Sequence, residues 1–116
     1  ILDFGDMLRT ALVCDLAIAA SYQVDAAAPL ESLAGFAAAW HREYPLLPDE
    51  ARLLPLLTQV RWLTTLAIAS HRAKSWPENA AYILRNAPAA RAGLAAFAPL
   101  PAAEAARTVA RACGLE

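Results

Sequence analysis

The sequence has few cysteines and glycines, and almost no surplus charge. Its 116 residues contain 2 cysteines and 4 glycines, and the formal net charge is −1 at pH 7. Because there is no Cys-x-x-Cys pair and no Cys/His cluster, we do not expect a zinc site. The small net charge gives no excess of basic residues that would attract nucleic acid or an anionic membrane surface, so neither is expected as a partner.

Targeting and membrane-spanning patterns are also missing. The first residues do not follow the pattern of a secretory leader, a basic segment before an apolar core. The longest apolar stretch, residues 53–70, contains Pro55 and, near its middle, Arg61. An unpaired charge at that depth argues against a membrane span. Two widely separated thiols favour a reducing compartment, so a cytoplasmic location is expected.

The chain is rich in apolar and helix-forming residues. Hydrophobic residues make up 59% of the sequence and charged residues 18%, which excludes a disordered tail and is enough for a core. Abundant alanine with sparse glycine predicts helices packed closely through small side chains. We therefore expect residues 1–116 to form a single, mainly α-helical domain of five to six helices, with a short strand remnant at residues 1–3.

Apolar periodicity and helix-breaking residues place the expected helices. They cover residues 12–24, 29–44, about 49–74, 78–85, 88–97 and 102–113. Pro55 is expected to divide the third helix into a short lead-in and a main part. The apolar stripe of that helix, expected to face the core, consists of Leu53, Leu56, Leu57, Val60, Leu63, Thr64, Ala67 and Ile68.

Two carboxylates stand at the head of the chain, in Asp3-Phe4-Gly5-Asp6. A carboxylate at the end of a short strand, beside a glycine turn, suits Mg²⁺, which prefers hard oxygen ligands and phosphate oxygens. The same four residues are also common in ordinary turns. From the residues alone, Asp3 is either a metal ligand or part of a turn.

Asp15 is the only charge in the expected helix 12–24, which is apolar on nearly every side. Such a helix is expected to be buried all round, and a buried carboxylate must find a partner. No basic residue lies three or four positions away in the same helix. The partner is expected to be backbone N–H groups or an arginine, which leaves a purely structural role open beside a functional one.

The stretch Ile1-Leu2-Asp3-Phe4-Gly5-Asp6, followed by Cys14-Asp15-Leu16-Ala17, resembles the C-terminal lobe of the aminoglycoside phosphotransferase family. This family of small-molecule kinases includes choline, homoserine and hydroxylysine kinases and shares the protein-kinase-like fold. The segment from Ser70 to Leu84 resembles the homoserine and hydroxylysine kinase-like branch more weakly. The resemblance implies a fragment of such an enzyme, because the nucleotide-covering lobe and the His-Gly-Asp catalytic loop would precede Ile1.

The resemblance implies a role for each matching acid. Asp3 would bind Mg²⁺, Asp15 would support the catalytic loop, and Asp6 would lie near the metal and nucleotide or cap the turn. The parent enzyme would transfer the γ-phosphate of ATP to a hydroxyl of an amino alcohol, a hydroxy amino acid or an aminoglycoside. The isolated chain is expected to be inactive, and a homodimer is left open. The alternative is a non-catalytic helical module that binds another protein.

Arg61 is the strongest candidate for contact with a substrate. It is the only charge between Arg52 and His71, and Thr65, Ile68 and Arg72 lie on its side of the helix. A guanidinium in that setting can bind a substrate carboxylate through two hydrogen bonds, or can pair with Asp15 or another buried acid. Tyr82 and Asn79 are pocket candidates through the resemblance alone. Trp40 and Trp62 are expected in the core, and His41 and His71 are not expected to act as bases.

Overall fold

The computed structural model describes residues 8–116 and is mainly helical, which confirms the expected class. The described residues contain no strand. The expected strand remnant, Asp3 and Asp6 all lie in residues 1–7, outside the described part of the chain. The helices are α1 (Val13–Gln23), α2 (Pro29–Glu43), α3 (Pro48–Ser75), the 3₁₀ turn η1 (Pro77–Asn79), α4 (Ala80–Ile83), α5 (Ala87–Phe97) and α6 (Ala102–Ala112).

Most helix ends fall where proline and glycine predict them. α2 begins at Pro29, whose missing N–H and fixed φ suit the first helical position. α6 is followed by Gly114, which has a φ of 68°, a left-handed conformation that glycine adopts without strain. Glu50 Oε2 accepts a hydrogen bond from the Leu47 N–H at 2.8 Å and so satisfies a free donor at the start of α3.

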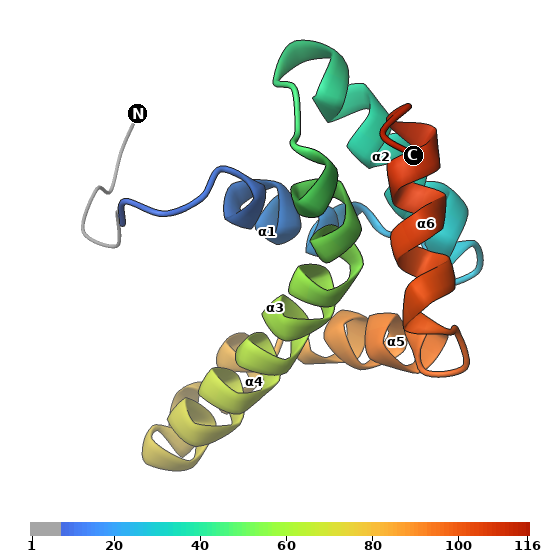
Figure 1. The fold of residues 1–116 in the computed structure, drawn as a ribbon. Helices are drawn as coiled ribbons and strands as arrows, with labels where there is room; N and C mark the ends of the chain where they lie inside the picture. Colours follow the sequence, from blue (N-terminus) through green and yellow to red (C-terminus); the bar gives the residue numbers. More distant parts are fainter. Residues whose placement is uncertain (1–7) are drawn as a thin grey trace.

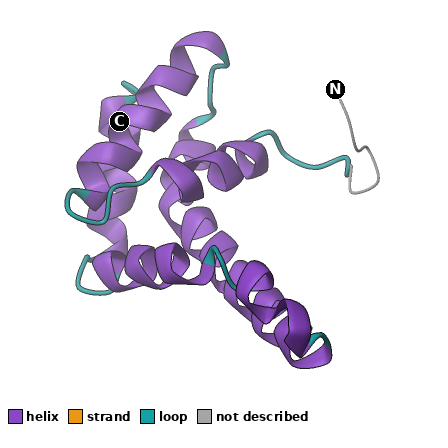
Figure 2. Ribbon diagram, turned by 180° about the vertical axis from the view of Figure 1, so that it is seen from behind, coloured by secondary structure: helices purple, strands orange, loops and turns teal. Residues whose placement is uncertain are grey.

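α3 is the central helix of the molecule. α1, α5 and α6 pack against it, and α2 packs against α6 and α1 (Figure 1). Seen from behind, the far half of α3 extends away from the other long helices with only the short α4 beside it (Figure 2). The molecule is flat and open, with principal extents of 49 × 35 × 17 Å. The core lies around the first half of α3 and is rich in alanine, which lets the helices approach closely.

The division of α3 at Pro55 is not found. The helix runs without a break from Pro48 to Ser75, with Pro55 buried inside it. Proline lacks the N–H that would bond to the carbonyl of Ala51, so the ladder loses a bond there. Burial of Pro55 and Ala51 against the core holds this part of the helix in place despite that loss.

The predicted core-facing stripe of α3 mostly faces outward, which corrects the sequence interpretation. Its inner face is buried and consists of Ala51, Leu54, Pro55, Thr58, Trp62 and Ala69. Its outer face is exposed and consists of Leu53, Leu56, Val60, Leu63 and Ala67. Both faces have helical spacing, because α3 is apolar around most of its circumference. Periodicity finds both stripes but does not say which one the other helices cover.

The expectation that α1 is buried on all sides is also wrong within the described chain. Its buried side consists of Val13, Leu16, Ala17 and Ala20, which meet α2 and α3. The opposite side is open: Ile18 is 41% exposed, Tyr22 is 59% exposed, and Asp15 is exposed as well. No element of residues 8–116 covers this side, so Asp15 does not carry the cost of burial that its sequence context predicted.

Among the described residues, α3 alone is long and apolar enough to cross a membrane by length and composition. A core helix of a globular protein passes the same test, so this finding by itself is weak evidence. Arg61 near the middle of the helix opposes such a span.

Candidate functional site

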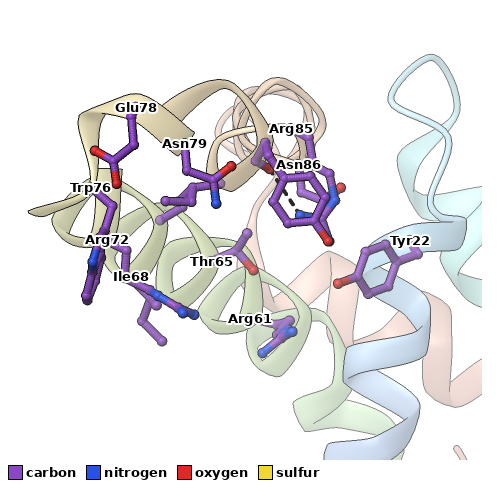
Figure 3. A pocket seen from close by; sticks show the side chains of 13 residues that line it. Tyr22, Arg61, Thr65, Ile68, Arg72, Trp76, Glu78, Asn79, Arg85 and Asn86 are labelled. Carbon is purple, nitrogen blue, oxygen red and sulfur yellow. Dashed lines mark hydrogen bonds between the residues drawn. The ribbon is translucent and has the colours of Figure 1, made fainter. Parts of the chain in front are cut away.

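A cavity of about 490 Å³ lies between the far half of α3 and the segment η1–α4 that returns alongside it. Arg61, Thr65, Ile68 and Arg72 line it from α3. Glu78, Asn79 and Tyr82 line it from the returning segment, and Tyr22 projects from α1 at the opposite end (Figure 3). The sequence prediction that Thr65, Ile68 and Arg72 share a face with Arg61 is confirmed.

The cavity exists because the chain reverses direction at Trp76-Pro77. The Trp76 N–H makes the last helical bond of α3, to the carbonyl of Arg72 at 2.9 Å. Pro77 follows at the first position of η1, where its ring cannot extend the preceding helix. Because η1 and α4 then run back along α3, residues 76–86 face residues 61–72 across the cavity.

Trp62 fixes the inner end of this region. Its Nε1–H donates to the carbonyl of Ser21 at 2.9 Å, which ties α3 to α1. Its ring packs against Phe97 with 5.7 Å between the centroids, and it lies directly on Gly93 of α5. Trp62 is 3% exposed, so the expectation that it belongs to the core is confirmed. Trp40 packs against the core as well, half-buried beside Tyr44.

Basic side chains outnumber acidic ones around the cavity. Arg61, Arg72 and Arg85 line it, whereas Glu78 is the one carboxylate among its described lining residues. The Arg85 guanidinium lies 4.0 Å from the centroid of the Tyr82 ring and donates to the Tyr82 carbonyl at 3.0 Å. Arg72 lies 6.0 Å from the Trp76 centroid. Within residues 8–116, no carboxylate lies within 4.0 Å of any of these three guanidinium groups.

Arg61 is the least satisfied of the three arginines. Its Nε is buried and has no hydrogen-bond partner among the described residues. The alternative in which Arg61 pairs with Asp15 is not found, because Asp15 is exposed and makes no ion pair in the described chain. A buried guanidinium N–H without a partner is costly, and an acceptor in the cavity would reach this atom only after the Arg61 side chain moves.

The acids proposed for metal binding cannot be placed. Asp3 and Asp6 lie outside the described residues, and residues 8–116 contain no group of three His, Cys, Asp or Glu side chains suited to a metal ion. His41 has a structural role, because its Nδ1 accepts a hydrogen bond from the Leu46 N–H at 2.9 Å. His71 is exposed on α3. The role of Asp15 in supporting a catalytic loop stays a prediction.

The structure thus brings together three residues that the sequence analysis selected, Arg61, Tyr82 and Asn79. Sequence reasoning missed Tyr22, Glu78 and Arg85 as members of the same cavity. The available signal was the helix break at Trp76-Pro77, since a short helix after a tight break can fold back along the preceding one as in an αα-hairpin. No local sequence pattern predicts that Tyr22 lines the cavity, because its position there depends on the angle between α1 and α3.

Comparison of the chain with models of protein families, with curated proteins and with solved structures gave no match.

Proposed function

We propose that this chain is the C-terminal part of an ATP-dependent phosphotransferase that phosphorylates a hydroxyl group of a small metabolite, and that it is inactive alone. The acceptor would be an amino alcohol, a hydroxy amino acid or an aminoglycoside. The observation that carries the proposal is the cavity, because it joins Arg61 and Tyr82, the two residues assigned to substrate binding from the sequence. The Asp3-Phe4-Gly5-Asp6 motif supplies the link to phosphoryl transfer.

Catalysis of this kind depends mainly on positioning and on neutralising phosphate charge. Under the proposal, Asp3 would hold Mg²⁺, which supplies that neutralisation when bound, and Asp6 would lie near the nucleotide. Asp15 would support the catalytic loop, which the preceding part of the enzyme would contribute together with the base. The described residues would bind the acceptor and orient it, with Arg61 as the charged anchor.

Two exposed apolar surfaces are consistent with a chain that packs against further protein. The outer face of α3 and the open side of α1 both present large apolar side chains, among them Leu56 at 56% exposed and Tyr22 at 59%. Apolar surfaces of this extent usually mark contact with another protein body. In the proposed enzyme, that body would be the rest of the catalytic lobe.

The test uses the enzyme that contains this chain together with its preceding lobe. We expect Asp3→Ala to lower turnover of Mg-ATP and an acceptor by about a hundredfold or more, because a metal ligand is removed. Asp49→Ala, at an exposed acid paired only with Arg52, serves as the matched control and should leave turnover unchanged. Full activity of the Asp3→Ala enzyme, or phosphoryl transfer by residues 1–116 alone, would contradict the proposal.

A second candidate is a non-catalytic helical module that binds another protein. The observation in its favour is the outer face of α3, whose apolar residues follow alternating steps of three and four, the spacing that lines one side of a partner helix. It predicts no phosphoryl transfer to an amino alcohol, a hydroxy amino acid or an aminoglycoside, and no dependence of partner binding on Asp3.

A further inference from the structure

We propose that the outer face of α3 binds the same face of a second copy of this chain, with the two helices antiparallel. The pairing depends on the described residues alone and not on phosphoryl transfer. It deepens the second candidate function by naming the partner of the helical module, a second copy. In the proposed phosphotransferase, the preceding lobe would compete with that second copy for the same face.

The first step is the exposure of this face. Its four large apolar side chains are between 47% and 56% exposed, and they are Leu53, Leu56, Val60 and Leu63. Residues of a helix turn about 100° per position, which puts the outer face opposite the buried inner face and away from the side that lines the cavity. A partner on the outer face therefore leaves the cavity open.

The second step is the spacing along this face, which continues from the first turn of α3 to the last. Steps of three and four alternate between eight exposed positions: Asp49, Leu53, Leu56, Val60, Leu63, Ala67, Ser70 and Lys74. These are the first and fourth positions of a seven-residue repeat, the pattern in which the side chains of one helix fit between those of another. The outer face is thus patterned for a helix along its whole length.

The third step identifies that helix, because the face is complementary to its own reversed copy. When two copies lie antiparallel with their centres aligned, Val60 meets Leu63 of the second copy. Leu56 then meets Ala67 of the second copy, a large side chain against a small one. Each contact occurs twice, since a two-fold pair uses the same surface of both copies.

The fourth step is the charge at the two ends of the face, which sets the direction of the pair. The Asp49 side chain is 91% exposed at one end, and its ion pair with Arg52, at 3.4 Å, lies at the surface. Lys74 is exposed at the other end. An antiparallel pair brings Asp49 to Lys74 of the second copy at both ends. A parallel pair would put like charges together at each end, which is unfavourable.

The size of the face predicts a weak pair. Stable interfaces bury about 1,200–2,000 Å² in total, and four large apolar side chains per copy reach at most the lower end of that range. We expect a dissociation constant of about 10–100 µM. The chain is then a monomer at the low micromolar concentrations that suit urea denaturation.

The experiment is sedimentation velocity of the 116-residue chain from about 5 to 500 µM, at low ionic strength to limit screening of the end charges. The unmodified chain should pass from monomer to dimer. Leu63→Glu puts a charge at the centre of the pair and should raise the dissociation constant at least about tenfold. Ile68→Glu is the matched control, because Ile68 is 52% exposed on the cavity side of the same helix, and it should pair like the unmodified chain.

Reversal of the end charges tests the direction of the pair. Lys74→Glu and Asp49→Lys each replace both attractive end contacts with repulsive ones, and each should weaken pairing about three- to tenfold. The double variant exchanges the two charges and keeps the net charge, so it should pair like the unmodified chain. A parallel pair would keep its affinity in both single variants, since like charges would still meet like charges.

Circular dichroism and thermal unfolding show whether each variant is folded. A chain that stays monomeric at about 500 µM would overturn the proposal and leave the outer face to the preceding lobe or to another protein. A folded Leu63→Glu chain that still pairs, or single charge reversals without effect, would overturn it as well. Sedimentation decides the pairing, whereas turnover of the Asp3→Ala parent enzyme decides the phosphotransferase, so either proposal can fail without the other.

Discussion

The two faces of α3 have similar chemistry and opposite surroundings. Leu54 on the inner face is completely buried, whereas Leu53 and Leu56 on the outer face are 48% and 56% exposed. The same contrast separates sequence neighbours: Trp62 is 3% exposed and Leu63 is 56% exposed. Neighbouring residues of a helix point about 100° apart, so one step along the chain can move a side chain from core to surface.

The difference teaches that apolarity does not distinguish the inner face, which combines small side chains with the large side chains of Leu54 and Trp62. It includes small side chains such as Ala51 and Ala69, which let neighbouring helices approach α3 closely. Thr58, the polar member, donates its hydroxyl to the Leu54 carbonyl at 2.8 Å and is thereby satisfied in the core. The outer face consists mainly of large side chains, which suit contact with a separate body.

One pair of substitutions tests this comparison with the largest expected effect. Leu54→Ala should lower the free energy of unfolding by about 2–5 kcal/mol, because it removes buried methyl groups and leaves a cavity. Leu56→Ala makes the same chemical change on the outer face and should change it by less than about 0.5 kcal/mol. Urea denaturation of both variants gives the two values. Equal losses would show that the outer face is also part of the core.

The helix bounds were largely predictable from the sequence because helix ends depend on local chemistry. Pro29 and Gly114 act within one turn of their own helices, so the bounds they predict agree with the structure. The prediction that Pro55 divides the third helix was wrong, because burial of Pro55 against the core holds α3 together at that point. The orientation of α3 was not predictable, since two apolar stripes satisfied the same periodicity and only the packing of α1, α5 and α6 distinguishes them.

From the residues themselves, the candidate site was predictable only in its α3 half; Tyr82 and Asn79, on the returning segment, were selected through the resemblance alone. Arg61 stood out because a lone charge in an apolar helix needs a reason, and its neighbours one and two turns away follow from helical geometry. Arg85 and Tyr22 come from elements whose distance from Arg61 depends on a chain reversal and on a helix crossing. Asp15 was misjudged because an apolar sequence was equated with burial, although the side of α1 that carries it has no cover in residues 8–116.

A pair of glycine substitutions sharpens the comparison by measuring how tightly the inner face is packed. A Cβ added to Gly93 of α5 would lie 2.5 Å from Cζ2 of the Trp62 ring, which is rigid and bound to Ser21. Gly93→Ala should therefore lower the free energy of unfolding by about 1–3 kcal/mol through overpacking.

Gly35 of α2 provides the matched control, because a Cβ there meets no atom within 4 Å. Gly35→Ala should raise the free energy of unfolding by about 0.5–1 kcal/mol, since alanine loses less entropy than glycine in a helix. Effects of the same sign at both glycines would mean that the Trp62 contact does not limit the approach of α5. Urea denaturation at constant pH measures both changes.

The smallest expected effect concerns the thiol at the end of α6, the helix that packs against α3. Burial raises the pKa of the Cys113 thiol above its ordinary value of 9.0, because the thiolate would lose hydration. The native state then holds this proton more tightly than the unfolded state. The stabilisation is complete below the thiol pKa of the unfolded chain and is lost as pH rises through the higher native value. The free energy of unfolding should fall between pH 8 and pH 10, and it should fall less in Cys113→Ala.

Half-buried Cys14 on α1 should also react with iodoacetamide faster than Cys113. The outcome that would contradict this is an identical dependence of the free energy of unfolding on pH in both chains, together with equal alkylation of the two thiols. It would mean that the end of α6 is open to solvent and that the buried core beside α3 does not extend as far as Cys113.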